Sequence, residues 1–103
     1  ALLAFFRSRL TGPGLYLLDE PEAALSPLRQ LALLVLLRDA IARGAQFVIA
    51  THAPIVAALP DARVLELDDR GLTETAWHDL EHVSLLRSFL SDPGAYLRSL
   101  EAS

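Results

Sequence analysis

The order of three apolar segments constrains the fold of this chain more than any other feature. Residues 15–18 and 46–50 form two short apolar runs without regular alternation, a pattern typical of strands buried on both faces in a parallel sheet. The segment between them, residues 27–43, is apolar around nearly its whole helical circumference. Ser26 predicts its N-cap, and Gly44 predicts its C-terminal stop. Strand, helix and strand in this order predict a βαβ unit with a right-handed crossover.

Shorter elements are predicted on both sides of this unit. Residues 72–77 alternate apolar and polar side chains, so we expect an antiparallel edge strand there, with Trp77 as a packing residue on it. The other expected elements are a helix over 1–10, a short helix over 54–59, a strand over 63–67, a helix over 79–90 and a final helix from Asp92-Pro93. With 103 residues and neither repeats nor a linker, the chain is predicted to be a single α/β domain over residues 1–103.

Composition excludes several classes of protein. The nine positive and thirteen negative charges leave a net charge of −4, which argues against a dedicated nucleic-acid binder. Because cysteine is absent, a disulfide framework and a thiolate metal site are both excluded. The longest uninterrupted apolar stretch, residues 31–37, is far shorter than the roughly 20 residues of a membrane-spanning helix. With no signal-peptide pattern present, we expect a cytoplasmic protein without direct membrane insertion.

Polar side chains follow both predicted central strands. Asp19 and Glu20 follow the first strand, and Thr51 and His52 follow the second. Taken singly, the first pair also fits a solvated turn and the second a helix cap. Ligands of parallel sheets, however, bind beyond the carboxyl ends of the strands, where both pairs would meet. One carboxylate could then organise Mg²⁺ while its neighbour, pointing differently, polarises a water molecule.

Two segments give a specific family resemblance. Residues 15–27, which include Asp-Glu-Pro-Glu-Ala-Ala-Leu-Ser-Pro, resemble the Walker B motif and D-loop of ABC-type ATPases. Residues 47–55, which include Thr-His-Ala-Pro-Ile, resemble the switch-histidine strand and loop of the same ATPases. Within that superfamily, both variants are similar to the soluble AAA-type ATPases related to the SMC and RecF group. The resemblance implies a P-loop NTPase-like fold, of which this chain would be the C-terminal lobe.

The resemblance also implies roles for individual residues, with ATP and Mg²⁺ as cofactors. Asp19 would organise Mg²⁺, through water, and Glu20 would be the general base for the hydrolytic water. His52 would contact the γ-phosphate and sense its loss. The D-loop, which crosses a dimer interface in these ATPases, would consist of Ala24, Leu25 and Ser26. Aspartate is frequent at the position of Ser26 in these ATPases. This departure from the pattern puts in doubt the role of the D-loop in communication between the two nucleotide sites.

Two of the expected ATPase motifs are not found in this sequence. All nine positive side chains are arginine, so the chain has no lysine for a phosphate loop, and the Leu-Ser-Gly-Gly signature is absent. We therefore expect the C-terminal portion of an ABC-type ATPase domain that needs its missing N-terminal half. We expect it to act in a homodimer that sandwiches nucleotide, and to be inactive in isolation. The alternatives are a non-enzymatic truncated lobe serving as an interaction module, and an ATPase of the OLD type with an added nuclease domain. Contact with nucleic acid stays open.

A second motif competes with this interpretation. Residues 78–82 match His-x-x-Glu-His, the inverted zinc-protease pattern, with two histidines four positions apart. A zinc site would need a further carboxylate ligand, for which Glu101 is the only candidate downstream, and Asp79 would have to cap the same helix. We expect polar residues at the start of a surface helix instead.

Overall fold

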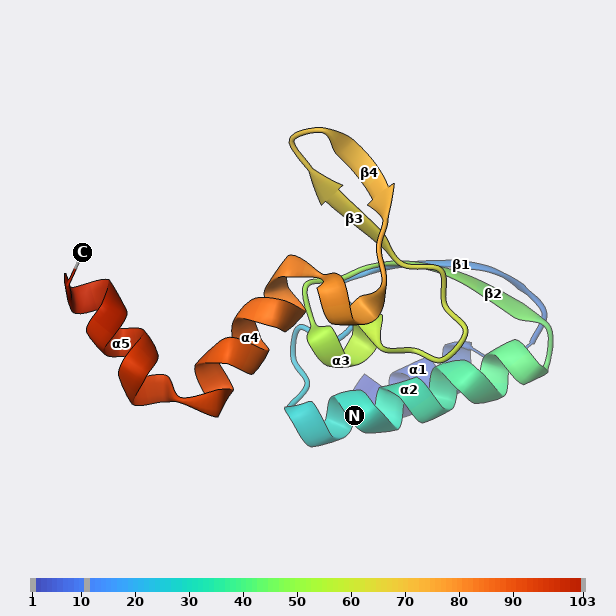
Figure 1. Cartoon of the computed structure of the whole chain (residues 1–103). Helices are drawn as coiled ribbons and strands as arrows, with labels where there is room; N and C mark the ends of the chain where they lie inside the picture. Colours follow the sequence, from blue (N-terminus) through green and yellow to red (C-terminus); the bar gives the residue numbers. More distant parts are fainter. Residues whose placement is uncertain (1, 11, 103) are drawn as a thin grey trace. The chain divides into compact units, whose positions relative to one another are not determined.

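The βαβ unit predicted from the sequence is present in the computed structural model, which describes residues 2–10 and 12–102. β1 (Gly14–Asp19) and β2 (Ala45–Ala50) pair in parallel, in a register that runs from Gly14 opposite Ala45 to Asp19 opposite Ala50. α2 (Pro27–Ala42) connects the two strands and lies along them (Figure 1). Both strands extend one residue further toward their N-terminal ends than the apolar runs predict.

Both ends of α2 form as its sequence predicts. The Ser26 backbone is extended, and its Oγ accepts a hydrogen bond from the Arg29 N–H at 3.4 Å, with proline at the first helical position. At the other end Gly44 adopts a φ of 100°, a conformation that glycine reaches without strain. The Gly44 N–H donates to the Ile41 carbonyl at 3.0 Å and so closes the last turn.

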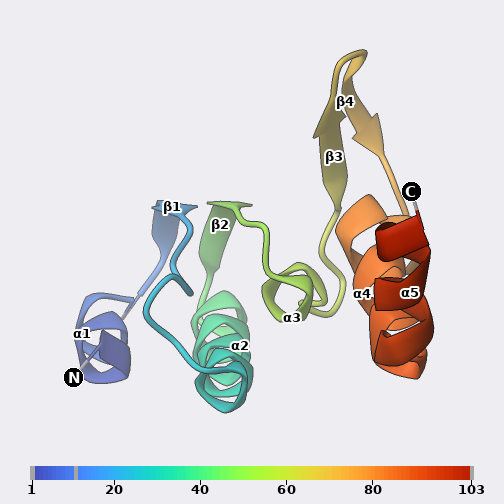
Figure 2. The same ribbon diagram turned by 90° about the vertical axis from the view of Figure 1, so that its left-hand side faces the viewer.

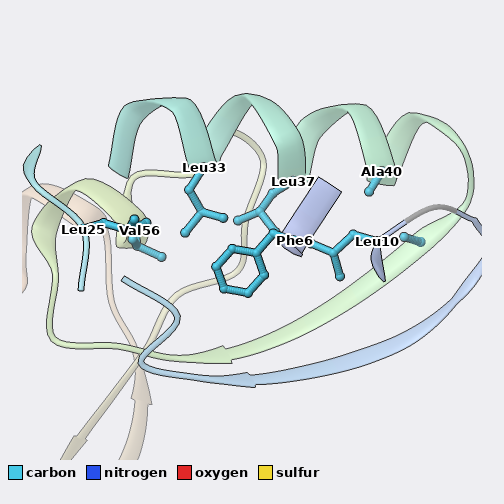
Figure 3. Close-up of a cluster of buried hydrophobic side chains, with 8 residues drawn as sticks. Phe6, Leu10, Leu25, Leu33, Leu37, Ala40 and Val56 are labelled. Carbon is cyan, nitrogen blue, oxygen red and sulfur yellow. The ribbon is translucent and has the colours of Figure 1, made fainter. Parts of the chain in front are cut away.

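One face of the β1–β2 sheet carries the hydrophobic core. α1 (Leu2–Arg9) and α2 both lie on this face, as Figure 2 shows. Leu33, Leu37 and Ala40 recur at helical spacing, so one stripe of α2 points toward the strands. In Figure 3 this stripe meets buried side chains from α1 and from the loops. The buried cluster consists of Phe6, Leu10, Leu25, Leu33, Leu37, Ala40, Ala45 and Val56.

The other face of this sheet is apolar and exposed. Leu15 and Leu17 of β1 are 63% and 73% exposed, and Val48 of β2 is 60% exposed. The expectation that both strands are buried on both faces is therefore wrong for this chain. Their side chains alternate in direction, and helices cover only the face toward which Tyr16 and Phe47 point, with their rings stacked at 5.3 Å.

The strands that follow form a separate hairpin. Residues 1–62 and 63–103 make two compact units, and the second begins with β3 (Leu65–Asp68) paired antiparallel to β4 (Gly71–Glu74). The expectation of an antiparallel edge strand on the parallel sheet is therefore wrong: β4 pairs with β3 in a separate two-stranded sheet. Because only residues 69 and 70 separate the two strands, β3 is the partner nearest to β4.

The chain leaves the hairpin earlier than the sequence suggests. After β4, the Thr75 N–H donates to the carbonyl of Val64, the residue before β3, at 3.0 Å. Trp77 therefore lies not on an edge strand, as expected, but at the start of the 3-10 helix η1 (Trp77–Asp79). α4 (Glu81–Ser91) begins two residues later than predicted.

The second unit ends in two helices. Asp92 Oδ1 accepts a hydrogen bond from the Ala95 N–H at 3.0 Å and so caps α5 (Pro93–Ala102), as its sequence predicts. The Phe89 and Tyr96 rings join α4 to α5 edge to face, at 5.9 Å. None of the helices within residues 2–10 and 12–102 is long and apolar enough to cross a membrane. The mixed α/β architecture, with a parallel two-stranded sheet and C-terminal helices, is compatible with a P-loop NTPase-like fold.

Candidate functional site

The carboxyl ends of β1 and β2 meet at one edge of the sheet. Asp19 lies opposite Ala50 in the strand register, and the Glu20 N–H donates to the Ala50 carbonyl at 2.7 Å, which extends the pairing by one residue. This extension brings the side chains that follow the strands together. Glu20 Oε1 lies 3.8 Å from His52 Nε2, although the two residues are 32 positions apart in the sequence.

This pair is open to solvent. The His52 side chain is 90% exposed and the Glu20 side chain is 53% exposed. An exposed ion pair of this length contributes little to stability, because water competes for both groups and their side-chain entropy opposes the contact. The pair is better suited to meeting a ligand than to holding the fold together. Asp19, the last residue of β1, is exposed as well.

The Glu20 backbone is strained. Its φ of 47° lies in the left-handed region, which non-glycine residues rarely occupy because Cβ crowds the backbone. The strand ends at this turn, where the Glu20 carbonyl accepts from the Ala23 N–H at 3.1 Å and Pro21 is buried. Strain of this kind persists where surrounding contacts enforce it, and it concentrates at functional sites. The turn directs the Glu20 side chain away from the strand, toward the β2 loop.

Glycine at position 20 is expected to stabilise the chain while removing the candidate base. Glu20→Gly relieves the left-handed strain, so the free energy of unfolding should rise by ~0.5–1 kcal/mol. The matched control is Asp61→Gly, at the other non-glycine residue with positive φ, 62°, among those described; it should give a similar gain. Urea unfolding of the 103-residue chain measures both. A loss of stability in Glu20→Gly alone would contradict the strain at this turn.

A buried carboxylate lies next to this pair, and the sequence reasoning missed it. Glu22 is only 8% exposed, and it is the one buried polar or charged residue among those that the structure describes. Thr51 Oγ1 donates a hydrogen bond to Glu22 Oε1 at 2.8 Å, and Thr51 Oγ1 also accepts a hydrogen bond from the Ala53 N–H at 3.0 Å. A sequence signal existed: Glu22 and Thr51 both follow strands that were expected to pair. The family resemblance gave a role to Glu20, which completes the Walker B pattern, and none to Glu22.

The expected D-loop residues have structural tasks here. Leu25 belongs to the buried cluster, and its N–H donates to the Glu22 carbonyl at 2.8 Å. Ser26 caps α2 through its hydroxyl group, and Ala24 is exposed. The part these three residues would play between two nucleotide sites stays a prediction.

Asp19 is the candidate ligand for a metal ion. Within residues 2–10 and 12–102 no three histidine, aspartate or glutamate side chains are placed to enclose a metal. A single carboxylate such as Asp19 fits Mg²⁺ as nucleotide enzymes bind it, with one or two carboxylates and with waters and substrate phosphates as the remaining ligands. The side chains of the zinc-protease motif do not form a zinc site. His78 lies in η1 and His82 in α4, so the two histidines do not share a helix as that motif requires.

Comparison with known families identifies an AAA-type domain in this chain. A family model described as "AAA domain, putative AbiEii toxin, Type IV TA system" matches residues 1–58, which include β1, α2, β2 and the Glu20–His52 pair. No curated protein matches the chain. More than half of the 103 residues fall within the matched segment. The chain therefore belongs to this AAA-domain family. Its AAA domain is of the nucleotide-binding ATPase type.

Proposed function

We propose that this chain supplies the Walker B, D-loop and switch-histidine part of an ABC-type ATPase domain, which binds and hydrolyses ATP. The observation that carries the proposal is the Glu20–His52 pair, 3.8 Å apart at the carboxyl edge of a parallel sheet. A carboxylate and an imidazole at such an edge are accessible to a nucleotide and close enough to act on the same phosphate.

Each group at the edge takes one task in hydrolysis. Asp19 would hold Mg²⁺ through water, and the ion would neutralise charge on the phosphates. Glu20 orients a water molecule and accepts its proton as the water oxygen bonds to the γ-phosphorus. The bond from that phosphorus to the bridging oxygen breaks, which leaves ADP and inorganic phosphate. His52 donates a hydrogen bond to the γ-phosphate and loses it once phosphate departs.

The nucleotide cradle must come from elsewhere, because these 103 residues contain no lysine. We propose that a phosphate-loop lobe, encoded upstream in the same reading frame, completes the domain. Such a lobe would also cover the exposed apolar face of the sheet formed by Leu15, Leu17 and Val48. We call the polypeptide that contains both parts the complete ATPase domain. Two copies would pair with ATP between them, through the segment around Ala24, Leu25 and Ser26.

The division of labour between the two lobes gives a direct test. The isolated 103-residue chain should neither bind ATP tightly nor turn it over, because nothing in it cradles the β- and γ-phosphates. The complete ATPase domain should do both in the presence of Mg²⁺. Isothermal titration with a non-hydrolysable ATP analogue and a phosphate-release assay measure the two properties.

The alternative function is a non-enzymatic interaction module. An upstream reading frame without a phosphate loop and signature motif would favour it, as would a complete ATPase domain without turnover. Turnover by the isolated chain that disappears in Glu20→Gln would instead overturn the dependence on a second lobe.

A further inference from the structure

We propose that the hydrogen bond between Thr51 and Glu22 is a positioning link, which holds the Glu20 turn and the His52 loop at their working separation. The proposal deepens the ATPase function and rests on it. Glu22 follows Glu20 by two positions, and Thr51 immediately precedes His52. The 2.8 Å bond between Thr51 Oγ1 and Glu22 Oε1 thus joins the two segments that carry the reactive pair.

Two connections between the segments bracket Glu20. On its N-terminal side the Glu20 N–H bonds to the Ala50 carbonyl at 2.7 Å, which ends the strand pairing. On its C-terminal side the Thr51–Glu22 bond is the next connection. Glu20 lies between them in a strained conformation, with φ at 47°. Without the second connection, fewer contacts would oppose relaxation of the turn, so the position of the Glu20 carboxylate would be less well defined.

The Thr51 hydroxyl group also fixes the His52 loop. Its oxygen accepts from the Ala53 N–H at 3.0 Å, so one bond spans His52 from the residue before it to the residue after it. With that N–H occupying a lone pair, the hydroxyl proton is free to bond to Glu22. The backbone of the loop is therefore held from within and by Glu22 in the turn after β1, while the His52 side chain stays 90% exposed for a ligand.

Burial separates the task of Glu22 from that of Glu20. Glu22 is 8% exposed and accepts from a neighbouring hydroxyl group, whereas Glu20 is half exposed. A hydrogen bond sheltered from water is stronger than one that water can replace, which suits a structural connection. A general base must instead reach the attacking water. Glu22 is therefore assigned to position Glu20 and His52, not to take a proton.

Four substitutions separate hydrogen bonding from charge. Thr51→Val and Glu22→Leu remove the bond, whereas Thr51→Ser keeps the hydroxyl group and Glu22→Gln keeps an acceptor oxygen without the charge. In the complete ATPase domain, the first two should lower kcat for ATP by about 10–100-fold, because small displacements of catalytic groups cost this much. KM for ATP should stay within about twofold, since neither residue meets the nucleotide. Thr51→Ser and Glu22→Gln should retain most of the wild-type kcat.

The second measurement does not depend on activity. In the full 103-residue chain, amide hydrogen exchange reports on Ala53, whose N–H bonds to Thr51 and not to Glu22. Glu22→Leu should speed exchange at Ala53 by about tenfold, because the link transmits the loss from one segment to the other. Glu22→Gln should leave the exchange rate unchanged.

A double substitution tests whether the two residues act through the same bond. In the complete ATPase domain, Thr51→Val combined with Glu22→Leu should slow ATP turnover no further than either substitution alone.

These experiments separate positioning by Glu22 from an effect of its charge. If Glu22→Gln loses as much kcat as Glu22→Leu, Glu22 acts through its charge and the positioning role is wrong. If Glu22→Leu leaves Ala53 exchange unchanged, the two segments are not linked in this way. A complete ATPase domain that hydrolyses no ATP defeats the proposed function, while the exchange experiment still decides whether the link exists. Should Glu22→Leu fail to fold, the comparison of Thr51→Val with Thr51→Ser decides the same question through kcat.

Discussion

Replacing Glu20 by glutamine is expected to lower ATP turnover of the complete ATPase domain by about 10²–10⁴-fold, the usual contribution of a general base. Glutamine has nearly the same shape but cannot accept the proton from the attacking water. The Glu20 backbone geometry and the bond from its N–H to the Ala50 carbonyl do not depend on the side chain. ATP should therefore still bind, and the unhydrolysed nucleotide should stabilise the dimer. Phosphate release and size-exclusion chromatography with ATP and Mg²⁺ measure both effects.

The matched control for this substitution is Glu74→Gln. Glu74 is an exposed carboxylate of the β3–β4 hairpin, 3.4 Å from Arg63, and it is no part of the candidate site. An exposed ion pair contributes little, so turnover should stay at the wild-type level. If Glu20→Gln hydrolysed ATP as fast as Glu74→Gln, Glu20 would not be the base. Loss of nucleotide binding in Glu20→Gln would place Glu20 in the ground-state complex instead.

Truncating Leu37 is expected to produce the largest loss of stability. Its side chain is fully buried, at 0% exposure, between α2 and the β1–β2 sheet, where Leu33 and Phe6 are its neighbours in the cluster (Figure 3). Leu37→Ala removes buried methyl groups and leaves a cavity, which costs about 2–5 kcal/mol. Domains of this size have only about 5–15 kcal/mol in total, so the urea midpoint of the 103-residue chain should fall steeply.

Leu28→Ala is the control on the same helix. Leu28 is 76% exposed in the first turn of α2, so its truncation should change stability by no more than about 0.5 kcal/mol. Equal losses in the two variants would contradict the orientation of α2 toward the sheet. If Leu37→Ala does not fold, Leu37→Val, which leaves a smaller cavity, gives a measurable intermediate loss.

The core and the candidate site depend on each other through β1 and β2. Tyr16 and Phe47 anchor the inner face of the sheet to the core, and the register they share places Asp19 opposite Ala50. A shift of one residue would reverse the direction of every side chain in the strand and separate Glu20 from His52. Packing below the sheet therefore sets the distance between reactive groups at its edge.

Local chemistry made part of this fold predictable from sequence. Ser26 and Gly44 marked the ends of α2 because a capping hydroxyl group and a left-handed backbone act within a few residues. The cap formed by Asp92 followed from the same rule. The meeting of Glu20 with His52 followed from the apolar runs before them, since parallel strands place their carboxyl ends at one edge.

The main failed expectations concerned the partner that a strand or a side chain takes in the fold. An apolar strand shows that its side chains avoid water, and it does not show which of its faces this chain covers. Leu15 and Leu17 are exposed for that reason. The alternation in residues 72–77 predicted a strand but not its partner, and β3 was the nearest backbone available. The burial of Glu22 depends on its contact with Thr51, which lies 29 residues further along the chain.

By itself, the sequence determined the βαβ order, the capped ends of its helix, and which polar groups follow each strand. These depend on neighbours along the chain, where spacing and residue type are sufficient. Only the tertiary structure decided that Glu20 adopts a left-handed backbone, that Glu22 is buried against Thr51, and that one sheet face is left without cover. The first two features arise with contacts between segments about 30 residues apart, and such contacts form only when packing has fixed the register of the strands. The third depends on which segments of this chain pack against the sheet.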